Sequence, residues 1–279
     1  MLAALGDEAR PLAGGQSLVP LMKLRLAAPA HLVDLNFVPG LASIARENGT
    51  LRFGALARHA DIEASSLVQQ VPILHDCAAG IADVQVRNRG TIGGSLAEAD
   101  PSGDWAPVLL ALETSVHVTG PQGERTIPLA DFITDAYTTQ LARAELIREI
   151  SVQVPPKSSG GAYLAFKRCA PVYATASAAV QLTLDASGTC AQARVFLGCV
   201  GLTAVRAADA EAALAGKDIG TKTIEAAAEA ARAAAEPHSD MRGSAEYKKD
   251  LVAALVRRAV EVAARRARGE RVELSHVYA

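Results

Sequence analysis

Aromatic residues, net charge and long apolar runs are all scarce in this chain of 279 residues. Only 4% of the residues are aromatic, although 50% are hydrophobic, and the formal net charge is −2. Because there is no basic excess, we expect no nucleic-acid partner. Charges or prolines interrupt every apolar run before it reaches the ~20 residues of a membrane-spanning helix. We therefore expect no membrane span and, since the start lacks a basic region, no signal peptide.

The cysteines do not form a metal-binding pattern. They are widely separated and include no C-x-x-C pair, the spacing typical of zinc and iron–sulfur sites. We therefore expect no metal site in this chain, and free thiols in a reducing compartment. The histidines are equally scattered, and we interpret each as structural. These residues are Cys77, Cys169, Cys190, Cys199, His31, His59, His75, His117, His238 and His276.

Two Gly-Gly pairs stand out, each with an apolar residue before it and a hydroxyl residue after it. The first lies in Leu12-Ala13-Gly14-Gly15-Gln16-Ser17 and the second in Thr91-Ile92-Gly93-Gly94-Ser95. Glycine permits positive φ and close approach of the backbone to a ligand, because it has no Cβ. Successive N–H groups in such turns form an anion-binding concavity. Taken singly, each pair is more often an ordinary tight turn, but side by side the two could hold a diphosphate.

Catalytic motifs are absent around this expected phosphate site. The chain has no G-x-S-x-G nucleophile elbow, and neither glycine pair is followed by the lysine of a P-loop. A phosphate site without a catalytic acid, base or nucleophile favours a bound cofactor that carries the chemistry itself.

Ser17 and Asp104 stand where helix caps are expected. Ser17 precedes an apolar stretch in which Pro20 suits the first turn of a helix. Asp104 precedes the apolar stretch 105–112, so capping is its simplest role. A carboxylate near a nucleotide could instead accept hydrogen bonds from a ribose or its neighbours. Both interpretations of Asp104 stay open at this point.

Turn signals and apolar spacing predict a mixed chain with a break at residues 155–161. We place a domain boundary there, because Pro155-Pro156 and Gly160-Gly161 interrupt the pattern. Asn48-Gly49 predicts a two-residue hairpin turn. After the boundary, the pattern predicts an α+β domain with a three-stranded antiparallel sheet. The expected helices are 18–28, 59–70, 72–81, 105–112, 204–235 and 246–268, and the expected strands are 10–13, 31–35, 42–47, 51–55, 115–119, 124–128, 147–154, 162–168, 175–184 and 191–200.

The glycine pairs belong to longer segments that carry a family resemblance. The first continues as Leu18-Val19-Pro20-Leu21-Met22, and the second is preceded by Gln85-Val86-Arg87-Asn88-Arg89-Gly90. Asp100-Pro101, Asp104, Phe166-Lys167-Arg168 and residues 239–247 follow the same pattern. Together they resemble the FAD-binding parts of the molybdenum hydroxylases, which include the medium subunit of aerobic carbon monoxide dehydrogenase and the central domain of xanthine dehydrogenase. The resemblance covers nearly the whole chain.

The resemblance implies a two-domain α+β protein that binds FAD. An FAD-binding domain of the vanillyl-alcohol-oxidase (PCMH-like) type would cover 1–156, with subdomains of about 1–37 and 38–156. The family's C-terminal domain would cover 161–279. Tyr173 lies where some relatives have an aromatic residue near the isoalloxazine, although an aromatic in a strand-edge turn explains it equally well. The implied cofactor-binding residues are Leu12, Ala13, Gly14, Gly15, Gln16, Ser17, Leu18, Ile81, Thr91, Ile92, Gly93, Gly94, Ser95, Asp104, Ile147, Lys167 and Tyr173, with none catalytic and none binding a metal.

Three features depart from the family pattern. Gln16 stands where carbon monoxide dehydrogenase relatives often have histidine, and Val172 where many have aspartate. These differences leave the surroundings of the flavin, and hence its electron acceptor, open. The N-terminus is shorter than is usual in the family. The chain also lacks a cysteine-bearing insertion found in one relative, so we expect no iron–sulfur cluster here.

The resemblance implies an FAD-carrying electron-transfer subunit of a heteromeric molybdenum hydroxylase. A large molybdopterin subunit would oxidise the substrate, and a small [2Fe–2S] subunit would pass electrons to the FAD. A quinone, a cytochrome or NAD would then accept them. We expect a dimer of heterotrimers in the cytoplasm, free or peripheral at the inner face of the membrane. Two alternatives stay open: a stand-alone flavin oxidase of the vanillyl-alcohol-oxidase type, and a scaffold subunit without cofactor.

Overall fold

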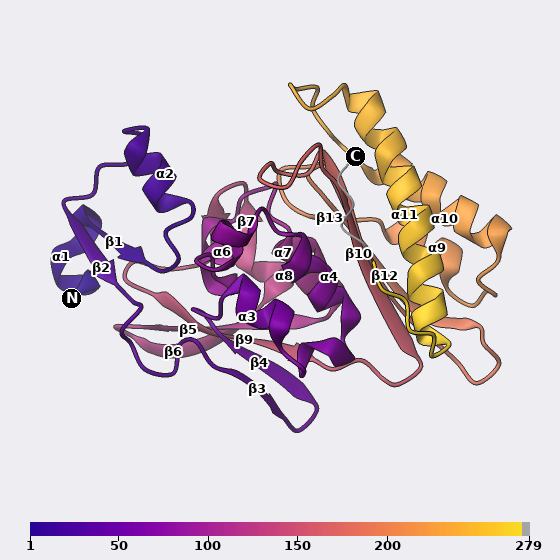
Figure 1. Cartoon of the computed structure of the whole chain (residues 1–279), viewed down its shortest axis with the longest axis horizontal. Helices are drawn as coiled ribbons and strands as arrows, with labels where there is room; N and C mark the ends of the chain where they lie inside the picture. The colour runs from indigo at the N-terminus through magenta and orange to yellow at the C-terminus, as the bar shows by residue number, and fades with distance from the viewer. Residues whose placement is uncertain (275–279) are drawn as a thin grey trace.

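The computed structural model describes residues 1–274, so His276 and the last residues of the expected C-terminal domain lie outside the described residues. Three parts follow one another along the chain (Figure 1). A small N-terminal unit comes first, then a five-stranded sheet with short helices, and then a four-stranded sheet covered by long helices. Mixed helix and sheet content was the expectation, and it is confirmed.

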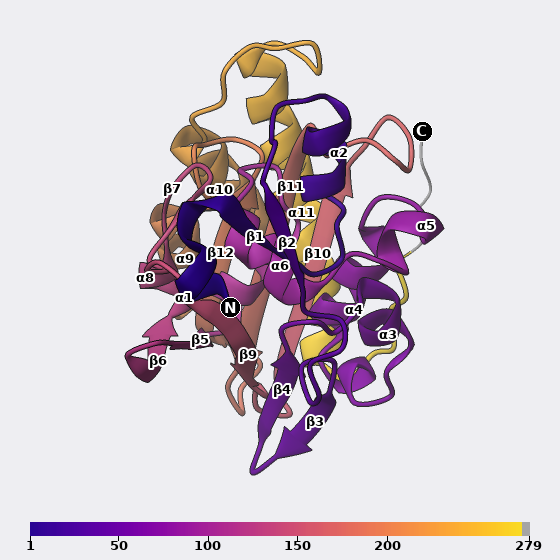
Figure 2. The same cartoon turned by 90° about the vertical axis from the view of Figure 1, so that its left-hand side faces the viewer.

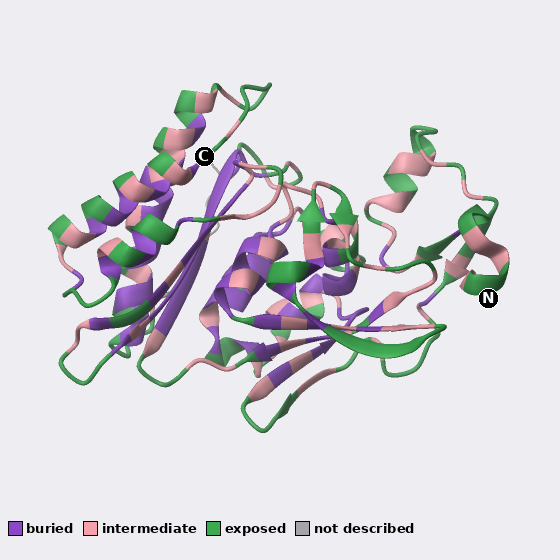
Figure 3. Cartoon of the chain, turned by 180° about the vertical axis from the view of Figure 1, so that it is seen from behind, coloured by how far each residue is buried: buried purple, intermediate pink, exposed green. Residues whose placement is uncertain are grey.

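The N-terminal unit is built on two parallel strands, β1 and β2. Most of its residues are exposed or half-buried (Figure 3), and none of its helices or strands is in extensive contact with the later elements described. The helix expected at 18–28 ends at Lys23, and Arg25 then adopts a left-handed backbone with φ of 58°. The elements are α1 (Leu2–Leu5), η1 (Gly6–Glu8), β1 (Ala9–Leu12), α2 (Leu18–Lys23) and β2 (His31–Asp34).

The five-stranded sheet has the order β3-β4-β9-β5-β6. The hairpin expected at Asn48-Gly49 is confirmed, because Glu47 pairs with Thr50 and both turn residues have positive φ. Positive φ at both positions is what a type I′ turn requires. The strands are β3 (Ile44–Glu47), β4 (Thr50–Gly54), β5 (Thr114–Gly120), β6 (Gly123–Pro128) and β9 (Leu146–Gln153).

Short helices lie between this sheet and the next one (Figure 1). The helix expected at 59–70 ends at Ala64, and a separate 3₁₀ turn follows. Trp105 and Phe53 are fully buried in the shared core of the sheet and these helices. The elements are α3 (His59–Ala64), η2 (Val68–Gln70), α4 (Pro72–Gly80), α5 (Val84–Arg87), α6 (Ile92–Glu98), α7 (Trp105–Ala111), α8 (Leu129–Phe132), β7 (Ile133–Asp135) and β8 (Thr138–Thr139).

The C-terminal sheet has four antiparallel strands rather than the three expected. The extra strand, β13, has only two residues, too few to show an alternating pattern in the sequence. The helix expected at 204–235 is two helices, because Gly216 with φ of 72° interrupts it. The elements are β10 (Ser159–Phe166), β11 (Ala176–Leu184), β12 (Cys190–Gly198), β13 (Val205–Arg206), α9 (Ala208–Leu214), α10 (Thr221–Ala234) and α11 (Ala245–Ala267).

Helices cover both faces of the C-terminal sheet. The helix α11 packs on β10 and β11, while α4 and α7 of the preceding part pack on the opposite face. This explains why nearly every residue of β11 is buried. Arg266 at the end of α11 donates a 3.0 Å hydrogen bond to the buried Asp76 of α4. The sheet therefore joins the two larger parts, and the residues that follow β10 enter their interface.

Candidate functional site

The two glycine segments lie against each other. A Cβ placed on Gly14 would come closer than 3 Å to the backbone of residues 89 and 90, 2.8 Å from Gly90 Cα and 2.9 Å from Arg89 C. A Cβ on Gly94 would lie 3.8 Å from Ala13 Cβ. Figure 2 looks from the side of the N-terminal unit, with α6 behind β1 and β2. Folding therefore brings together segments that are far apart in sequence, as expected.

The second Gly-Gly pair is not a left-handed turn, contrary to the expectation. Thr91 caps α6, and the glycines form the first turn of that helix. Their N–H groups are already used within the protein: Gly93 N donates to Ala55 O at 2.9 Å, and Gly94 N donates to Thr91 Oγ1 at 3.1 Å. A Cβ on Gly93 would lie 2.6 Å from Ala55 Cβ, so this glycine serves close packing. The expected row of free N–H groups is wrong for this segment.

The first segment has the free N–H groups that the second lacks. Gly15 has φ of 73°, and the amides of residues 14–18 donate no hydrogen bond to any atom of residues 1–274. Ser17 stands at the start of α2, but its side chain makes no capping hydrogen bond, so that expectation is wrong. Gly15 O and Ser17 O accept from later amides of the helix. Five consecutive donors are thus left for a ligand.

These features fit a diphosphate. An anion with several oxygens satisfies successive backbone N–H groups, and a segment of small residues lets it come close. The hydroxyl of Ser17 and that of Ser95, both half-buried, make no side-chain hydrogen bond within residues 1–274. Leu12 and Leu18 flank the donors, and Gln16 is exposed beside them. The first segment supplies the donors, and the second supplies a close wall.

A buried polar cluster lies at the interface of the two larger parts. Asp104 accepts hydrogen bonds from Tyr163 Oη at 2.6 Å and from Lys167 Nζ at 3.5 Å. Lys167 Nζ also donates to Gly80 O at 2.7 Å, and Ile81 follows directly. Asp104 makes no capping hydrogen bond, so its role as a helix cap is ruled out. Ile81, Asp104 and Lys167 are therefore brought together.

The charged side chains of this cluster are buried. Asp104 is 8% exposed and Lys167 is 6% exposed. Burial, then the charge of Asp104, raises the pKa of the Tyr163 phenol. Burial and the same carboxylate raise the pKa of the Cys199 thiol to about 12. These neighbours stay protonated at neutral pH, so they act as neutral donors or apolar packing rather than as charges.

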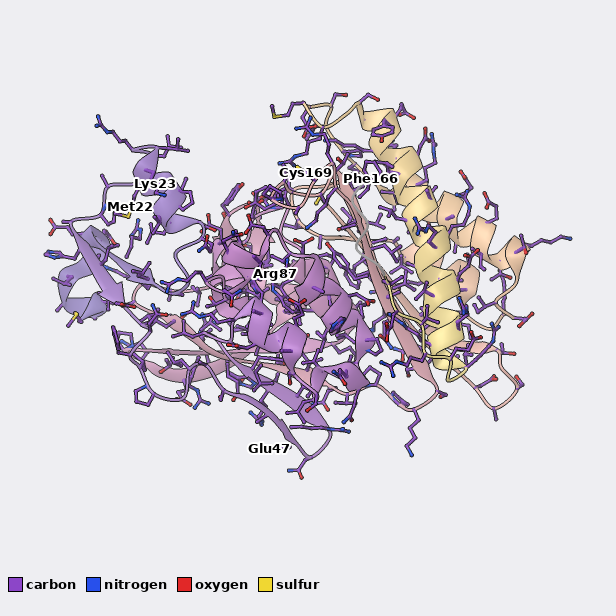
Figure 4. All side chains as sticks on the ribbon, in the orientation of Figure 1. Met22, Lys23, Glu47, Arg87, Phe166 and Cys169 are labelled. Carbon is purple, nitrogen blue, oxygen red and sulfur yellow. The ribbon has the colours of Figure 1, made fainter. Side chains whose placement is uncertain are left out.

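Ile147 and Tyr173 differ in how the structure places them. Ile147 is buried in β9. The next residue, Arg148, accepts a 3.0 Å hydrogen bond at its backbone oxygen from Ala55 N, and Ala55 O in turn accepts from Gly93 N. Tyr173 is 47% exposed on the loop between β10 and β11, where Figure 4 labels Phe166 and Cys169. Arg242 lies 5.6 Å from its ring centroid. Burial, then the Asp100 carboxylate, raises the pKa of Tyr173.

Sequence reasoning did not identify Tyr163, Asn36 or Arg58, and it assigned His59 only a structural role. His59 is buried, and its Nδ1 accepts a 3.1 Å hydrogen bond from Trp105 Nε1. Burial, then the nearby arginine charges, lowers its pKa to about 4. Its ring lies beneath the second segment, 2.7 Å from where a Cβ on Gly90 would be. No motif in the sequence marks these residues, because each has a partner that is distant in the chain.

The remaining features of the described structure do not add to this candidate site. A cleft of about 510 Å³ lies between α7 and β5 on one side and β12 and β13 on the other, and none of the expected cofactor-binding residues lines it. Within residues 1–274, no three His, Cys, Asp or Glu side chains come together as metal ligands would. No helix of that part combines the length and the apolar character needed to cross a membrane.

Comparisons with known proteins identify the family of the chain. Residues 1–156 match the family described as the FAD binding domain in molybdopterin dehydrogenase. Residues 161–263 match the CO dehydrogenase flavoprotein C-terminal domain. The chain is similar to the 6-hydroxypseudooxynicotine dehydrogenase complex subunit alpha of Paenarthrobacter nicotinovorans, with 42% identity over 99% of this chain and 94% of that protein. It is also similar to the carbon monoxide dehydrogenase medium chain of Afipia carboxidovorans, with 40% identity over 96% of this chain and 93% of that protein.

A solved structure shows the same fold. It is the carbon monoxide dehydrogenase from Hydrogenophaga pseudoflava that lacks the Mo-pyranopterin moiety of the molybdenum cofactor. One of its chains superposes with a TM-score of 0.90 at 42% identity, covering 94% of this chain and 91% of that one. The chain therefore belongs to the family of FAD-binding subunits of the molybdenum hydroxylases.

Proposed function

We propose that this chain is the FAD-carrying electron-transfer subunit of a heteromeric molybdenum hydroxylase. It receives electrons from [2Fe–2S] clusters of a small partner subunit and passes them to an external acceptor. Substrate oxidation takes place on a large molybdopterin subunit. The observation that carries this proposal is the contact between Gly14 and the backbone of residues 89 and 90, beside five free amide donors. The family membership supports the same function.

The chain's own residues bind and orient the cofactor in this proposal. The amides of residues 14–18 hold the diphosphate, and residues 91–95 form the close wall beside it. Ile81, Asp104, Ile147 and Lys167 contact the cofactor farther along; for Ile81, Asp104 and Lys167, their clustering at the domain interface supports the assignment. FAD, when bound, supplies the exchange between one-electron and two-electron carriers. Tyr173 lies beside the ring in this proposal, and the interaction of its phenol with Asp100, which follows α6 closely, supports this assignment.

The domain boundaries and the assembly belong to the proposal as well. An FAD-binding domain of the vanillyl-alcohol-oxidase type covers 1–156, with subdomains of about 1–37 and 38–156, and a C-terminal domain covers 161–279. The sparse contact between the N-terminal unit and the rest supports the subdomain division. The complex is a dimer of heterotrimers in the cytoplasm, free or at the inner face of the membrane, and its acceptor is a quinone, a cytochrome or NAD.

An absorption spectrum and the copurifying proteins test this function. The full chain, purified natively, should carry bound flavin with a band near ~450 nm, because the cofactor supplies the chemistry. It should copurify with an iron–sulfur subunit and a molybdenum subunit. A chain with flavin but no partners, which oxidises a substrate alone, would show a stand-alone oxidase. A chain with both partners but no flavin would show a scaffold subunit.

A further inference from the structure

Arg58 and Asn36 together link the two glycine segments through hydrogen bonds. Arg58 directly precedes α3, and its guanidinium donates one hydrogen bond to Arg89 O, just before the second segment. It donates another to Asn36 Oδ1. Asn36 Nδ2 in turn donates to Ala13 O at 3.0 Å, inside the first segment. One planar guanidinium therefore binds Arg89 O and, through Asn36, is connected to the first segment; a lysine ammonium, as a point charge without the planar fork, is less suited to holding two separate acceptors.

Asn36 is held in place by its own neighbours. Its backbone N–H donates to Asp34 Oδ1 at 2.9 Å, and its side-chain Nδ2 donates to the same oxygen at 2.6 Å. Both hydrogens of the Nδ2 group are then used, one by Asp34 and one by Ala13. The carbonyl oxygen is left to accept from Arg58. Asn36 is thus a fixed connector between β2 and the guanidinium rather than a freely rotating side chain.

The link matters because little else holds the N-terminal unit. Besides the Gly14 contact and the Arg58–Asn36 hydrogen bond, two polar contacts are found between residues 1–37 and 38–274: the local turn bond from Val38 N to Leu35 O, and the ion pair of Arg143 with Asp7 at 3.5 Å. Both of those side chains are highly exposed, and exposed ion pairs contribute little to stability. The distance between the two glycine segments therefore depends mainly on the Gly14 contact and the link through Arg58.

We propose that Arg58 is a positioning residue for the FAD cradle. Together with Asn36, it holds the free amides of residues 14–18 at a fixed place relative to residues 90–95. Arg58 acts through the backbone carbonyl of Arg89 and the side-chain oxygen of Asn36, and not as a positive charge that attracts the diphosphate. This inference rests on the proposed FAD-binding function, and it adds two residues that the family resemblance did not supply.

A double-mutant cycle with FAD as the probe tests this role. The first variant is Arg58→Lys, which keeps the charge. The second is Asn36→Ala, which removes the side chain that connects Arg58 to Ala13 O, and the third combines the two changes. The control is Arg257→Lys. Arg257 in α11 donates two hydrogen bonds to Glu225 in α10, far along the chain from the glycine segments. FAD affinity of the full chain is measured by flavin fluorescence, and the melting temperature without FAD is measured for each variant.

Arg58→Lys and Asn36→Ala should each weaken FAD binding by about tenfold to a hundredfold, the effect of a lost charged hydrogen bond. The double variant should bind no worse than the weaker single variant, and all should melt close to the Arg257→Lys control. Wild-type affinity in Arg58→Lys, or losses that add in the double variant, would overturn the positioning role while leaving the proposed function intact. If Arg58→Lys does not fold, Asn36→Ala alone decides by the same criterion. A wild-type chain that binds no FAD would overturn both proposals.

Discussion

Replacing Gly14 with alanine is the sharpest perturbation of the site that the structure offers. Gly14 does not have a positive φ, so alanine can adopt its backbone conformation. The added methyl would instead meet backbone, at 2.8 Å from Gly90 Cα and 2.9 Å from Arg89 C. Backbone atoms cannot rotate away as a flexible side chain can. The two segments would have to separate by about 1 Å to restore normal carbon–carbon contacts of 3.5–4.0 Å.

The expected effect follows from the cost of overpacking. Forcing an extra methyl group into a packed contact typically costs about 1–3 kcal/mol. If the cofactor requires the segments at their present separation, this cost appears in binding, as a rise in the dissociation constant for FAD of about 5-fold to 150-fold. The melting temperature without FAD should change little, because the N-terminal unit is loosely attached and can move.

A fluorescence titration with FAD measures this effect, and Gly220→Ala is the matched control. Gly220 also has no positive φ, and a Cβ there would meet only Asp218 Oδ2 at 3.9 Å, an ordinary contact. Gly14→Ala should bind FAD much more weakly than Gly220→Ala. Equal affinity in the two variants would refute the reasoning that the contact between the segments defines the site.

Two other predictions concern buried polar groups. Tyr163→Phe should lower the free energy of unfolding by about 1–3 kcal/mol in a denaturant titration, because Asp104 then keeps a lone pair without its donor; a loss no larger than that of Tyr247→Phe, a change at a half-exposed ring, would contradict this. His59 has a pKa of about 4 in the folded chain, against 6.5 for the unfolded side chain, so the unfolded state binds more protons between these values. Stability should therefore be complete above pH 6.5 and fall by about 3 kcal/mol as the pH drops towards 4. His59→Gln should flatten this part of the stability curve, whereas His75→Gln, at an exposed position, should leave it unchanged. An unchanged slope in His59→Gln would show that other groups cause it.

The sequence predicted those features that depend on neighbouring residues. Asn48-Gly49 marked its hairpin correctly, because both residues tolerate the positive φ of the turn. The composition of the alanine-rich stretch 204–235 predicts one helix, although Gly216 interrupts it. Alanine favours helix throughout such a stretch, so composition alone does not reveal where a helix stops.

The candidate site was predictable only in part, and for a physical reason. The two glycine pairs were recognisable, but their different tasks were not. Gly93 packs against Ala55, and Gly94 donates to Thr91, so both depend on the helix that Thr91 begins. The link from Arg58 to Asn36 joins residues that are 22 positions apart in the chain. Local patterns carry no information about such a contact, because folding alone brings the two side chains together.

Amide hydrogen exchange with and without FAD tests the central claim most directly. The account predicts that FAD slows the exchange of the amides of residues 14–18, which have no acceptor within the described part of the chain. The amides of Ile92, Gly93 and Gly94 are already hydrogen-bonded and should be slow in both states. FAD that binds but leaves the exchange of residues 14–18 unchanged would contradict the account.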